Sequence, residues 1–483
     1  MRFVLFFHLT LLAVLRLCAL ERASGSDVKF SQLDLFRLAN VSAKLGLTLF
    51  NGIRGIRAVH DLMPGETLVI LPFSSLMAGS PWQWRSPSPE ISQRYWGPAS
   101  MSARTIAVAA AELYHGKASR FAAYFEHVPT QFDSLGHWTE EELWQLHDPE
   151  LMSQARQKER MPKQEYHKLL ASTPSSHISL EDWERATELV ISRAFAISAH
   201  PGPNGPTVIA MVVLGVSIAA SLWKRHRRAA QRILMCTVAS AAVSRAILVA
   251  FAIYDLKTIA LLPVIDDLNH AMEANVESRL TVKSPWQMLW EHGMWEKALE
   301  LKAGSTSIAA GQQVVTTYGN HSNGFYLLNY GFVVPDNPFQ TYRLGNLTQQ
   351  LAATGWRPAD TEDPQHRSNR ARLQQVVILQ CRFLQPDLLA LKSLMSSSAH
   401  PGESDNPDMM TLDSELMMAL QKALALVRKT WVTSLEQDVV LLAVGNFTER
   451  GYLALQYRLH RKRILIDCEE GIKKQLKLLS APS

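Results

Sequence analysis

The chain has few cysteines, and none of them lie close together in sequence. The four cysteines, Cys18, Cys236, Cys381 and Cys468, show no CxxC spacing. Structural zinc sites use cysteines a few residues apart, and small secreted domains carry dense cysteine frameworks. The sequence therefore predicts neither a zinc site nor a disulfide framework, and we expect no metal cofactor.

A strong charge of one sign is also missing. The net charge is +5 over 483 residues, and the basic residues form no long tract beyond KRHRR at 224–228. Nucleic-acid-binding domains concentrate Lys and Arg on one face, so we expect no nucleic-acid partner. With 47% hydrophobic and 19% charged residues, the composition is typical of a globular protein of two or three domains, shifted slightly towards membrane proteins.

The first apolar run is too short to span a membrane. Residues 1–23 combine a basic residue, an apolar run of signal-peptide length and small residues at Ala19 and Ala23. Arg16 interrupts the run and leaves it short of the about 20 residues that a spanning helix needs. We expect a cleaved signal peptide over 1–23, with a signal anchor as the alternative.

The globular part alternates between strand and helix patterns. Residues 47–77 contain short apolar runs separated by Gly, Asn, Asp and Pro-Gly, which predicts short strands and tight turns. From about 101 to 195, apolar residues recur at helical spacing with acidic first turns. Strands are expected again from 261 to about 334, and helices from about 370 onward.

An apolar insert at 201–255 separates two of these blocks. It contains apolar runs at 207–223 and 233–254, joined by KRHRRAAQR, and Arg245 lies in the second run. As a helix the first run extends roughly 25 Å, close to the roughly 30 Å thickness of the hydrocarbon layer. We expect both runs to cross a membrane as a hairpin. The alternatives are a peripheral amphipathic insert and an error in the gene model.

Three separated segments combine glycine, asparagine, histidine and tyrosine in a way that isolated turns do not explain. They are GIRGIRA at 52–58, PVIDDLNH at 263–270 and VVTTYGNHSNGFYLLNYGFVVPDNP at 314–338, and SRAF at 192–195 lies between the first two. In this order they resemble the SET-domain protein methyltransferases, in the branch that contains Rubisco large-subunit lysine methyltransferase and actin-histidine methyltransferase. The resemblance covers about 45–470 apart from the insert.

The resemblance implies an α+β protein with three parts. A SET β-fold at 45–335 would carry a helical insert at about 101–200 and the apolar hairpin, and an all-α substrate-binding domain would follow at 340–483. It further implies an S-adenosylmethionine (AdoMet)-dependent protein N-methyltransferase acting on a protein substrate, with lysine on a non-histone protein as the expected acceptor. The zinc-binding cysteines of histone-directed relatives are absent. The alternatives are a protein-histidine methyltransferase and a catalytically inactive, membrane-tethered interaction module.

By the same resemblance, the cofactor contacts are expected in the glycine-containing turn and in PVIDDLNH. These residues are Gly52, Ile53, Arg54, Gly55, Asn269 and His270. Glycine allows the backbone to approach a ligand closely, and Ile53 stands where the family pattern has the first glycine of G-x-G. His292 and His321 have no place in the family pattern, so we expect them to be solvated loop residues.

On the acceptor side, the resemblance assigns Tyr318 and Tyr330 to the wall of the channel as catalytic residues. A free lysine amine has a pKa of about 10.4, so it needs a dry environment to lose its proton near neutral pH. Asp266 and Arg193 are expected to position the substrate. For Arg193, a structural ion pair with an acidic neighbour such as Asp266 is an equally good interpretation.

The expected location follows from the insert and the first residues. Positively charged loops stay on the cytoplasmic side of a membrane, which predicts a cytoplasmic position for KRHRRAAQR. The catalytic domain would then lie on the non-cytoplasmic side, where a signal peptide would also deliver it. We expect a membrane-associated protein of the secretory pathway, or of an organelle reached through it, such as a plastid.

Overall fold

The computed structural model describes most of the globular part of the chain. The described residues are 35–36, 39–50, 52–79, 83–198, 231, 235, 257–282, 297–345, 347–355, 376–379, 382–383 and 414–479. The predicted signal peptide lies outside them, as does nearly all of the predicted hairpin, so both stay predictions. Among the helices in the described ranges, none is long and apolar enough to cross a membrane.

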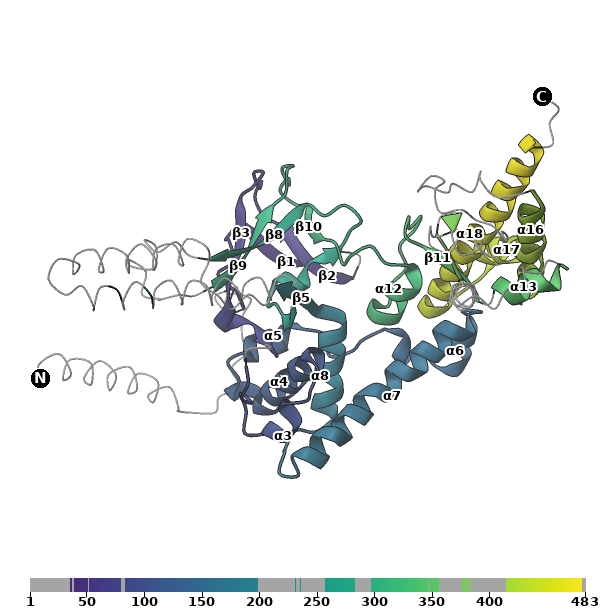
Figure 1. The fold of residues 1–483 in the computed structure, drawn as a ribbon. Coiled ribbons are helices and arrows are strands. Elements are labelled where there is room, and N and C mark those ends of the chain that lie inside the picture. Colours follow the sequence, from purple (N-terminus) through teal and green to yellow (C-terminus); the bar gives the residue numbers. More distant parts are fainter. Residues whose placement is uncertain are drawn as a thin grey trace, which may run out of the picture.

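Two halves stand side by side in Figure 1. The first contains the small sheets and most of the helices of the insert, and the second contains the C-terminal helices. The long helix α7 (Pro149–Ser172) runs from the first half towards the second, and α12 (Asn323–Tyr330) lies between them. The chain passes through α12 on its way to the C-terminal half, so residues on α12 can contact both.

The strands of the first half form three small sheets. Their orders are β1-β2-β10-β7, β3-β9-β8 and β4-β6-β5. The strands are β1 Leu45–Phe50, β2 Ile53–Ala58, β3 Thr67–Pro72, β4 Met77–Ala78, β5 Ala194–Ser198, β6 Lys257–Leu261, β7 Asn269–His270, β8 Val276–Val282, β9 Lys297–Ala303 and β10 Gln313–Thr316. The strands expected between 47 and 77 are confirmed.

The helical block expected between about 101 and 195 is confirmed as far as Arg193. It comprises α4 Met101–His115, α5 Ala122–His127, α6 Glu140–Trp144, α7 and α8 Leu180–Arg193, with the short α3 Gln93–Trp96 before it. Ser100 and Ser179 cap α4 and α8, since each side-chain oxygen accepts a hydrogen bond from the backbone N–H three residues later. The two helices pack against each other and against β6.

The expectation of strands up to about 334 is wrong for Asn323–Tyr330, which form helix α12. Ser322 caps its start by accepting from the N–H of Phe325, and Gly331 ends it in the left-handed region at φ 78°. A Cβ atom at Gly331 would lie 2.6 Å from the Asp133 carbonyl oxygen, so only glycine fits there. The aromatic residues of this segment favour strands in general, and the two caps overrule that preference locally.

The C-terminal half is mainly helical but not all-α, which corrects the prediction for 340–483. Its helices are α13 Leu347–Ala353, α16 Ser414–Lys429, α17 Leu435–Val444 and α18 Glu449–Leu479. A three-stranded sheet, β11 Thr341–Gly345, β12 Val376–Leu379 and β13 Arg382–Phe383, packs with them. β11 and α18 both contribute to a separate apolar core, so the sheet belongs to the folding of this half.

Candidate active site

Neighbouring strands bring together the separated segments that the sequence singled out. β2 pairs with β10 in antiparallel register, with Ile56 opposite Val314. β10 pairs with β7 in parallel register, with Val315 opposite Asn269 and Thr316 opposite His270. The glycine-containing turn, the PVIDDLNH segment and the approach to Tyr318 therefore lie side by side.

The turn between β1 and β2 contains two glycines with different roles. Gly52 has a φ of 83°, which glycine adopts without strain, and it makes the reversal between the paired residues Phe50 and Ile53. A Cβ atom on Gly55 would lie 2.6 Å from the amide nitrogens of both Asn269 and Gln313. Gly55 is therefore the residue whose missing side chain leaves room next to Asn269.

Ile53 does not intrude into that space, because its side chain is 63% exposed. Asn269 Nδ2 donates a hydrogen bond to the Arg54 carbonyl oxygen at 3.0 Å, which ties the turn to β7. The guanidinium group of Arg54 forms an ion pair with Asp267 Oδ1 at 3.1 Å. Of the four turn residues, Arg54 and Gly55 lie against Asn269, whereas Gly52 and Ile53 face solvent.

His270 lies in a cluster of aromatic rings. Its ring centroid is 4.9 Å from that of Tyr326, 5.3 Å from Tyr318 and 5.7 Å from Phe332. Nδ1 accepts a hydrogen bond from the Tyr318 backbone N–H at 3.1 Å. Burial, with a smaller effect of His321, lowers the pKa of His270, so the imidazole stays neutral near pH 7. Its Nε2 is buried without a hydrogen-bond partner.

Of the two histidines expected in solvated loops, His321 is only partly exposed. Its ring stacks on that of Phe325 with centroids 3.9 Å apart. His292 lies outside the described residues.

Tyr318 and Tyr330 lie together, as expected of residues that share one wall. Their ring centroids are 4.8 Å apart. Tyr318 Oη donates a hydrogen bond to the Leu268 carbonyl oxygen at 2.9 Å, which fixes the direction of its hydroxyl group. Burial raises the pKa of both tyrosines, so both hydroxyl groups remain protonated near neutral pH.

A cavity of about 150 Å³, the acceptor cavity, lies beside these tyrosines. Its wall includes four of the residues assigned from the sequence: Arg193, Asp266, Tyr318 and Tyr330. The rest comes largely from the SRAF segment, with Ser192, Ala194 and Phe195. Side chains from α8, η4 (Ile265–Asp267) and α12 therefore converge on one small space.

Arg193, at the end of α8, holds η4 in place. Its Nη1 donates to the Asp266 carbonyl oxygen at 2.8 Å and forms an ion pair with Asp267 Oδ1 at 3.2 Å. The ion pair thus involves Asp267, not the Asp266 carboxylate named in the sequence interpretation. Asp267 is nearly fully buried between the guanidinium groups of Arg193 and Arg54.

Asp266 is buried and has one side-chain partner that the sequence did not suggest. Tyr124, on α5, donates its hydroxyl hydrogen to Asp266 Oδ2. Burial raises the pKa of Asp266 to about 7, and the charge of Arg193 offsets only part of this effect. Oδ1 is buried without a hydrogen-bond partner. Near neutral pH this carboxyl group can therefore hold or release a proton beside the acceptor cavity.

Sequence reasoning missed Tyr124 and Asp267. Tyr124 is one aromatic residue among many on the apolar faces of the insert, and nothing in its spacing distinguishes it. Asp267 stands next to Asp266 in DDLNH, and adjacent acidic residues give no indication of which side chain is paired. Among the described residues, no three His, Cys, Asp or Glu side chains are grouped so as to hold a metal ion.

The fold is that of SET-domain methyltransferase structures, with the three small sheets, the helical insert and the C-terminal helices. The crystal structure of the SET domain of LSMT bound to lysine and AdoHcy has a TM-score of 0.59 and 17% sequence identity, and the match covers 93% of this chain and 91% of that one. The structure of Rubisco LSMT bound to AdoMet has a TM-score of 0.58 and 18% identity, over 93% and 92%. The α+β SET fold is thereby confirmed.

Sequence similarity to characterised proteins is local. No protein-family model matches the chain. A ribosomal lysine N-methyltransferase of Schizosaccharomyces pombe is 36% identical over 85 residues, or 17% of this chain, and the match spans 13% of that protein's length. The likeness therefore concerns one segment and not the whole protein.

Proposed function

We propose that this protein is an AdoMet-dependent protein-lysine N-methyltransferase. The observation that carries the proposal is the acceptor cavity, in which Tyr318, Tyr330 and Asp266 meet next to the strands that carry Gly55 and Asn269. Support also comes from the fold, which is shared with LSMT structures bound to AdoMet or to lysine and AdoHcy.

The residues around the turn fit the proposed cofactor. His270 Nε2 and Gln313 Nε2 are buried without partners, and buried polar groups normally have one, so a polar ligand would satisfy them. The missing side chain of Gly55 lets the Asn269 and Gln313 amides pack directly against the turn. We assign Arg54, Gly55, Asn269 and His270 to cofactor binding. When bound, AdoMet supplies an activated methyl group for transfer to a nucleophile in line with its sulfur.

The acceptor side must hold an amine that has lost its proton. The aromatic rings of Tyr318 and Tyr330 exclude water from one side of the cavity, and a dry site lowers the pKa of a lysine amine. Asp266 can accept a proton at Oδ1 because its pKa lies at about 7. A cavity of about 150 Å³ has room for one extended side chain and restricts its direction of approach.

The inactive interaction module is less well supported than the enzyme. The altered glycine turn and the apolar insert favour that module, but the Ile53 side chain in the turn is 63% exposed and does not lie between Gly55 and Asn269. A histidine acceptor remains the second candidate, because both acceptors need the same dry aromatic wall. A non-histone protein substrate is part of the proposal, based on the missing zinc-binding cysteines.

Replacing Asn269 by Ala should weaken AdoMet binding roughly 5- to 150-fold. The change removes the donor to the Arg54 carbonyl oxygen and loosens the turn from β7, a loss that typically costs about 1–3 kcal/mol. Isothermal titration calorimetry on the purified full chain measures the affinity. Asn329→Ala, on the exposed end of α12, is the matched control and should bind normally. An intact chain that binds no AdoMet would favour the inactive module.

We also propose that the insert is a membrane hairpin with both ends on one side. The flanking strands support this arrangement, because β5 and β6 pair in antiparallel register with Ser198 opposite Lys257. Since paired strands cannot lie on opposite faces of a bilayer, the insert must cross twice or not at all. We propose that the catalytic domain lies on the non-cytoplasmic side of the membrane, opposite the basic tip KRHRRAAQR.

Protease added to sealed membrane vesicles should leave the catalytic and C-terminal domains intact and cut at most within KRHRRAAQR. Immunoblotting against a C-terminal tag reports the result, and detergent-treated vesicles provide the control in which both domains are digested. Release of the intact protein by a carbonate wash, or digestion without detergent, contradicts the hairpin.

A further inference from the structure

A second site lies away from the acceptor cavity, between the helical insert and the C-terminal half. It is a cavity of about 280 Å³. Trp144 and His147 line it from the insert, and Tyr342, Trp431 and Arg458 line it from the C-terminal half. We call it the aromatic–cationic pocket.

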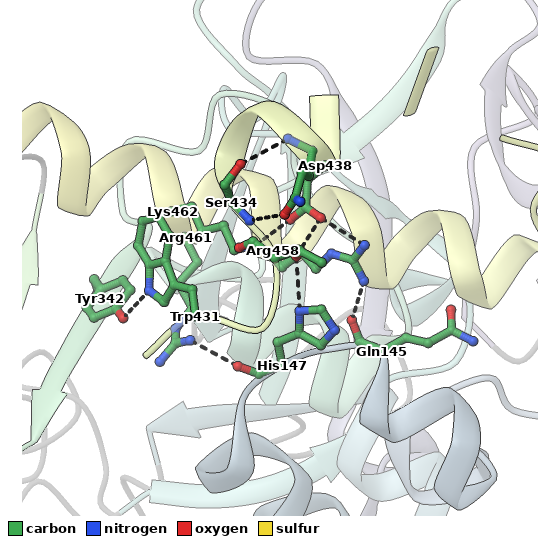
Figure 2. A network of polar contacts seen from close by, with 11 residues as sticks. Gln145, His147, Tyr342, Trp431, Ser434, Asp438, Arg458, Arg461 and Lys462 are labelled. Atoms are coloured by element: carbon green, nitrogen blue, oxygen red, sulfur yellow. Dashed lines mark hydrogen bonds and ion pairs between the residues drawn. The ribbon is translucent and has the colours of Figure 1, made fainter. Parts of the chain in front are cut away.

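Basic side chains from one stretch of α18 form the charged side of this pocket. Arg458 and Lys462 are buried, and both contact Asp438 of α17, with Arg458 Nη2 at 3.0 Å from Oδ1 and Lys462 Nζ at 2.6 Å from Oδ2. Figure 2 shows this network. Arg461 lies on the same helix and forms an ion pair with Asp148 at 3.3 Å. Among these groups, three cations face two carboxylates, which leaves one positive charge in excess.

Two further observations are consistent with this excess of positive charge. Arg458 Nε is buried without a hydrogen-bond partner, although buried guanidinium N–H groups are normally paired. His147 faces Arg458 and Lys462, and burial together with these two cations lowers its pKa to about 4, with Asp438 opposing the effect. His147 also has a φ of 49°, in the left-handed region that asparagine, aspartate and histidine adopt more readily than other residues with side chains. The pocket therefore favours a negative charge.

The rim of the pocket is apolar and open to solvent. Trp144 and Val432 are each 58% exposed. Inside, the indole N–H of Trp431 donates to Tyr342 Oη at 3.0 Å, so the aromatic wall is rigid. An occupant with a short apolar stem and an anionic tip matches this combination.

The pocket is linked to the acceptor cavity by a third cavity. This one has a volume of about 360 Å³ and shares Asp148 and Arg461 with the aromatic–cationic pocket. It extends to Phe325, whose ring centroid is 6.2 Å from that of Tyr330 in the wall of the acceptor cavity. The three cavities are therefore neighbours along the junction of the two halves.

We propose that the aromatic–cationic pocket binds a glutamate or aspartate side chain of the protein substrate. The proposal rests on the proposed function for the nature of the occupant. It adds a selection rule, namely an acidic residue at a fixed separation from the methylated residue. It also explains why Arg458 and Lys462 of α18 are buried, and Arg461 partly buried, at the junction of the two halves.

The imidazole signal of His147 provides a direct test in the full chain. N-acetyl-glutamate amide is titrated into protein carrying ¹³C-labelled histidine, at constant ionic strength, and the His147→Asn variant assigns the signal, since Asn tolerates a positive φ. A bound carboxylate offsets the field of the cations, so the pKa of His147 should rise from about 4 towards its ordinary 6.5. N-acetyl-glutamine amide has the same shape without the charge and should cause no rise.

The sign of a charge at the rim should control the affinity. Val432→Glu should weaken binding of N-acetyl-glutamate amide about fivefold, and Val432→Lys should strengthen it. Val444→Glu is the matched control, because Val444 is 77% exposed on α17 and does not line the pocket, so this change should have no effect. Equal effects of Val432→Glu and Val432→Lys would overturn the proposal.

Two further outcomes also overturn it. If inorganic phosphate raises the pKa of His147 more than the glutamate probe does, the pocket binds a phosphate group instead. If no anion changes the pKa of His147 (a flat titration), the pocket is not an anion site. The titration needs neither AdoMet nor methyl transfer. A flat titration in a chain that binds AdoMet therefore rejects only the pocket, whereas a rise in a chain that binds no AdoMet rejects only the methyltransferase.

Discussion

Replacing Tyr330 by Phe is expected to lower methyl transfer about 100-fold while AdoMet affinity changes less than about threefold. Tyr330 lines the acceptor cavity, and its ring packs against Tyr318 with centroids 4.8 Å apart. The Tyr318 hydroxyl group is already committed to the Leu268 carbonyl oxygen, so it cannot reorient to replace the one that is lost. Phenylalanine keeps the aromatic ring in the cavity wall and removes only the hydroxyl group, which we propose positions the acceptor amine.

The measurement is transfer of labelled methyl groups from AdoMet to an extract of cells that lack this chain, with AdoMet affinity measured on the same preparations. Tyr114→Phe deletes the same atom from a tyrosine that is 42% exposed and does not line the cavity, so it serves as the control. Equal losses in methyl transfer and in AdoMet affinity would show that Tyr330 belongs to the cofactor side.

Replacing Asp266 by Asn is expected to stabilise the protein above neutral pH while lowering its activity. The pKa of Asp266 is about 7 in the folded protein, compared with an ordinary value of 3.8. The folded state therefore binds a proton that the unfolded state releases over this interval. The resulting stability is complete below pH 3.8 and is lost as the pH rises through about 7.

Above that range the buried carboxylate costs up to about 4 kcal/mol, because each unit of difference in pKa corresponds to about 1.4 kcal/mol. Asparagine is neutral at every pH and can still accept the hydrogen bond from Tyr124. The variant should therefore unfold at a higher urea concentration than the parent at pH about 8, and the difference should shrink towards pH about 4.

Urea unfolding across this pH range measures the effect, and Asp336→Asn, in an exposed turn where asparagine tolerates the φ of 48°, is the control. A parent chain whose stability advantage over the variant grows with pH would mean that Asp266 is held as a stabilised carboxylate. Loss of activity together with a gain in stability is the pattern expected of a functional residue that is kept at a cost to folding.

Much of the first half of the structure was predictable because its signals are local. Ser100 and Ser179 stand before apolar residues at helical spacing, and a serine hydroxyl group can cap a helix wherever that sequence occurs. Short apolar runs bounded by Gly and Asn gave β1 and β2. The order of the motifs led to the fold, since each motif supplies residues to one meeting point of strands.

The two errors have different causes, because one lies in local capping signals and the other in strand pairing between distant segments. Asn323–Tyr330 carry aromatic residues typical of strands, yet Ser322 and Gly331 cap a helix whose end approaches the Asp133 backbone. The sheet formed by β11, β12 and β13 pairs Thr341–Gly345 with Val376–Leu379, which lie about 30 residues apart in sequence. Strand formation depends on such cross-strand packing more than on the residues of one strand, so the local sequence did not predict it.

The sequence by itself determined the residue types of the candidate site, because Gly55, Asn269, Tyr318 and Tyr330 stand in short motifs whose order can be identified without the structure. Only the tertiary structure decided the partners. Packing places Asp267, and not Asp266, between the guanidinium groups of Arg193 and Arg54. Ion pairs and pKa shifts depend on distance and burial, and both arise only when α5, α8 and η4 come together, so no motif encodes them.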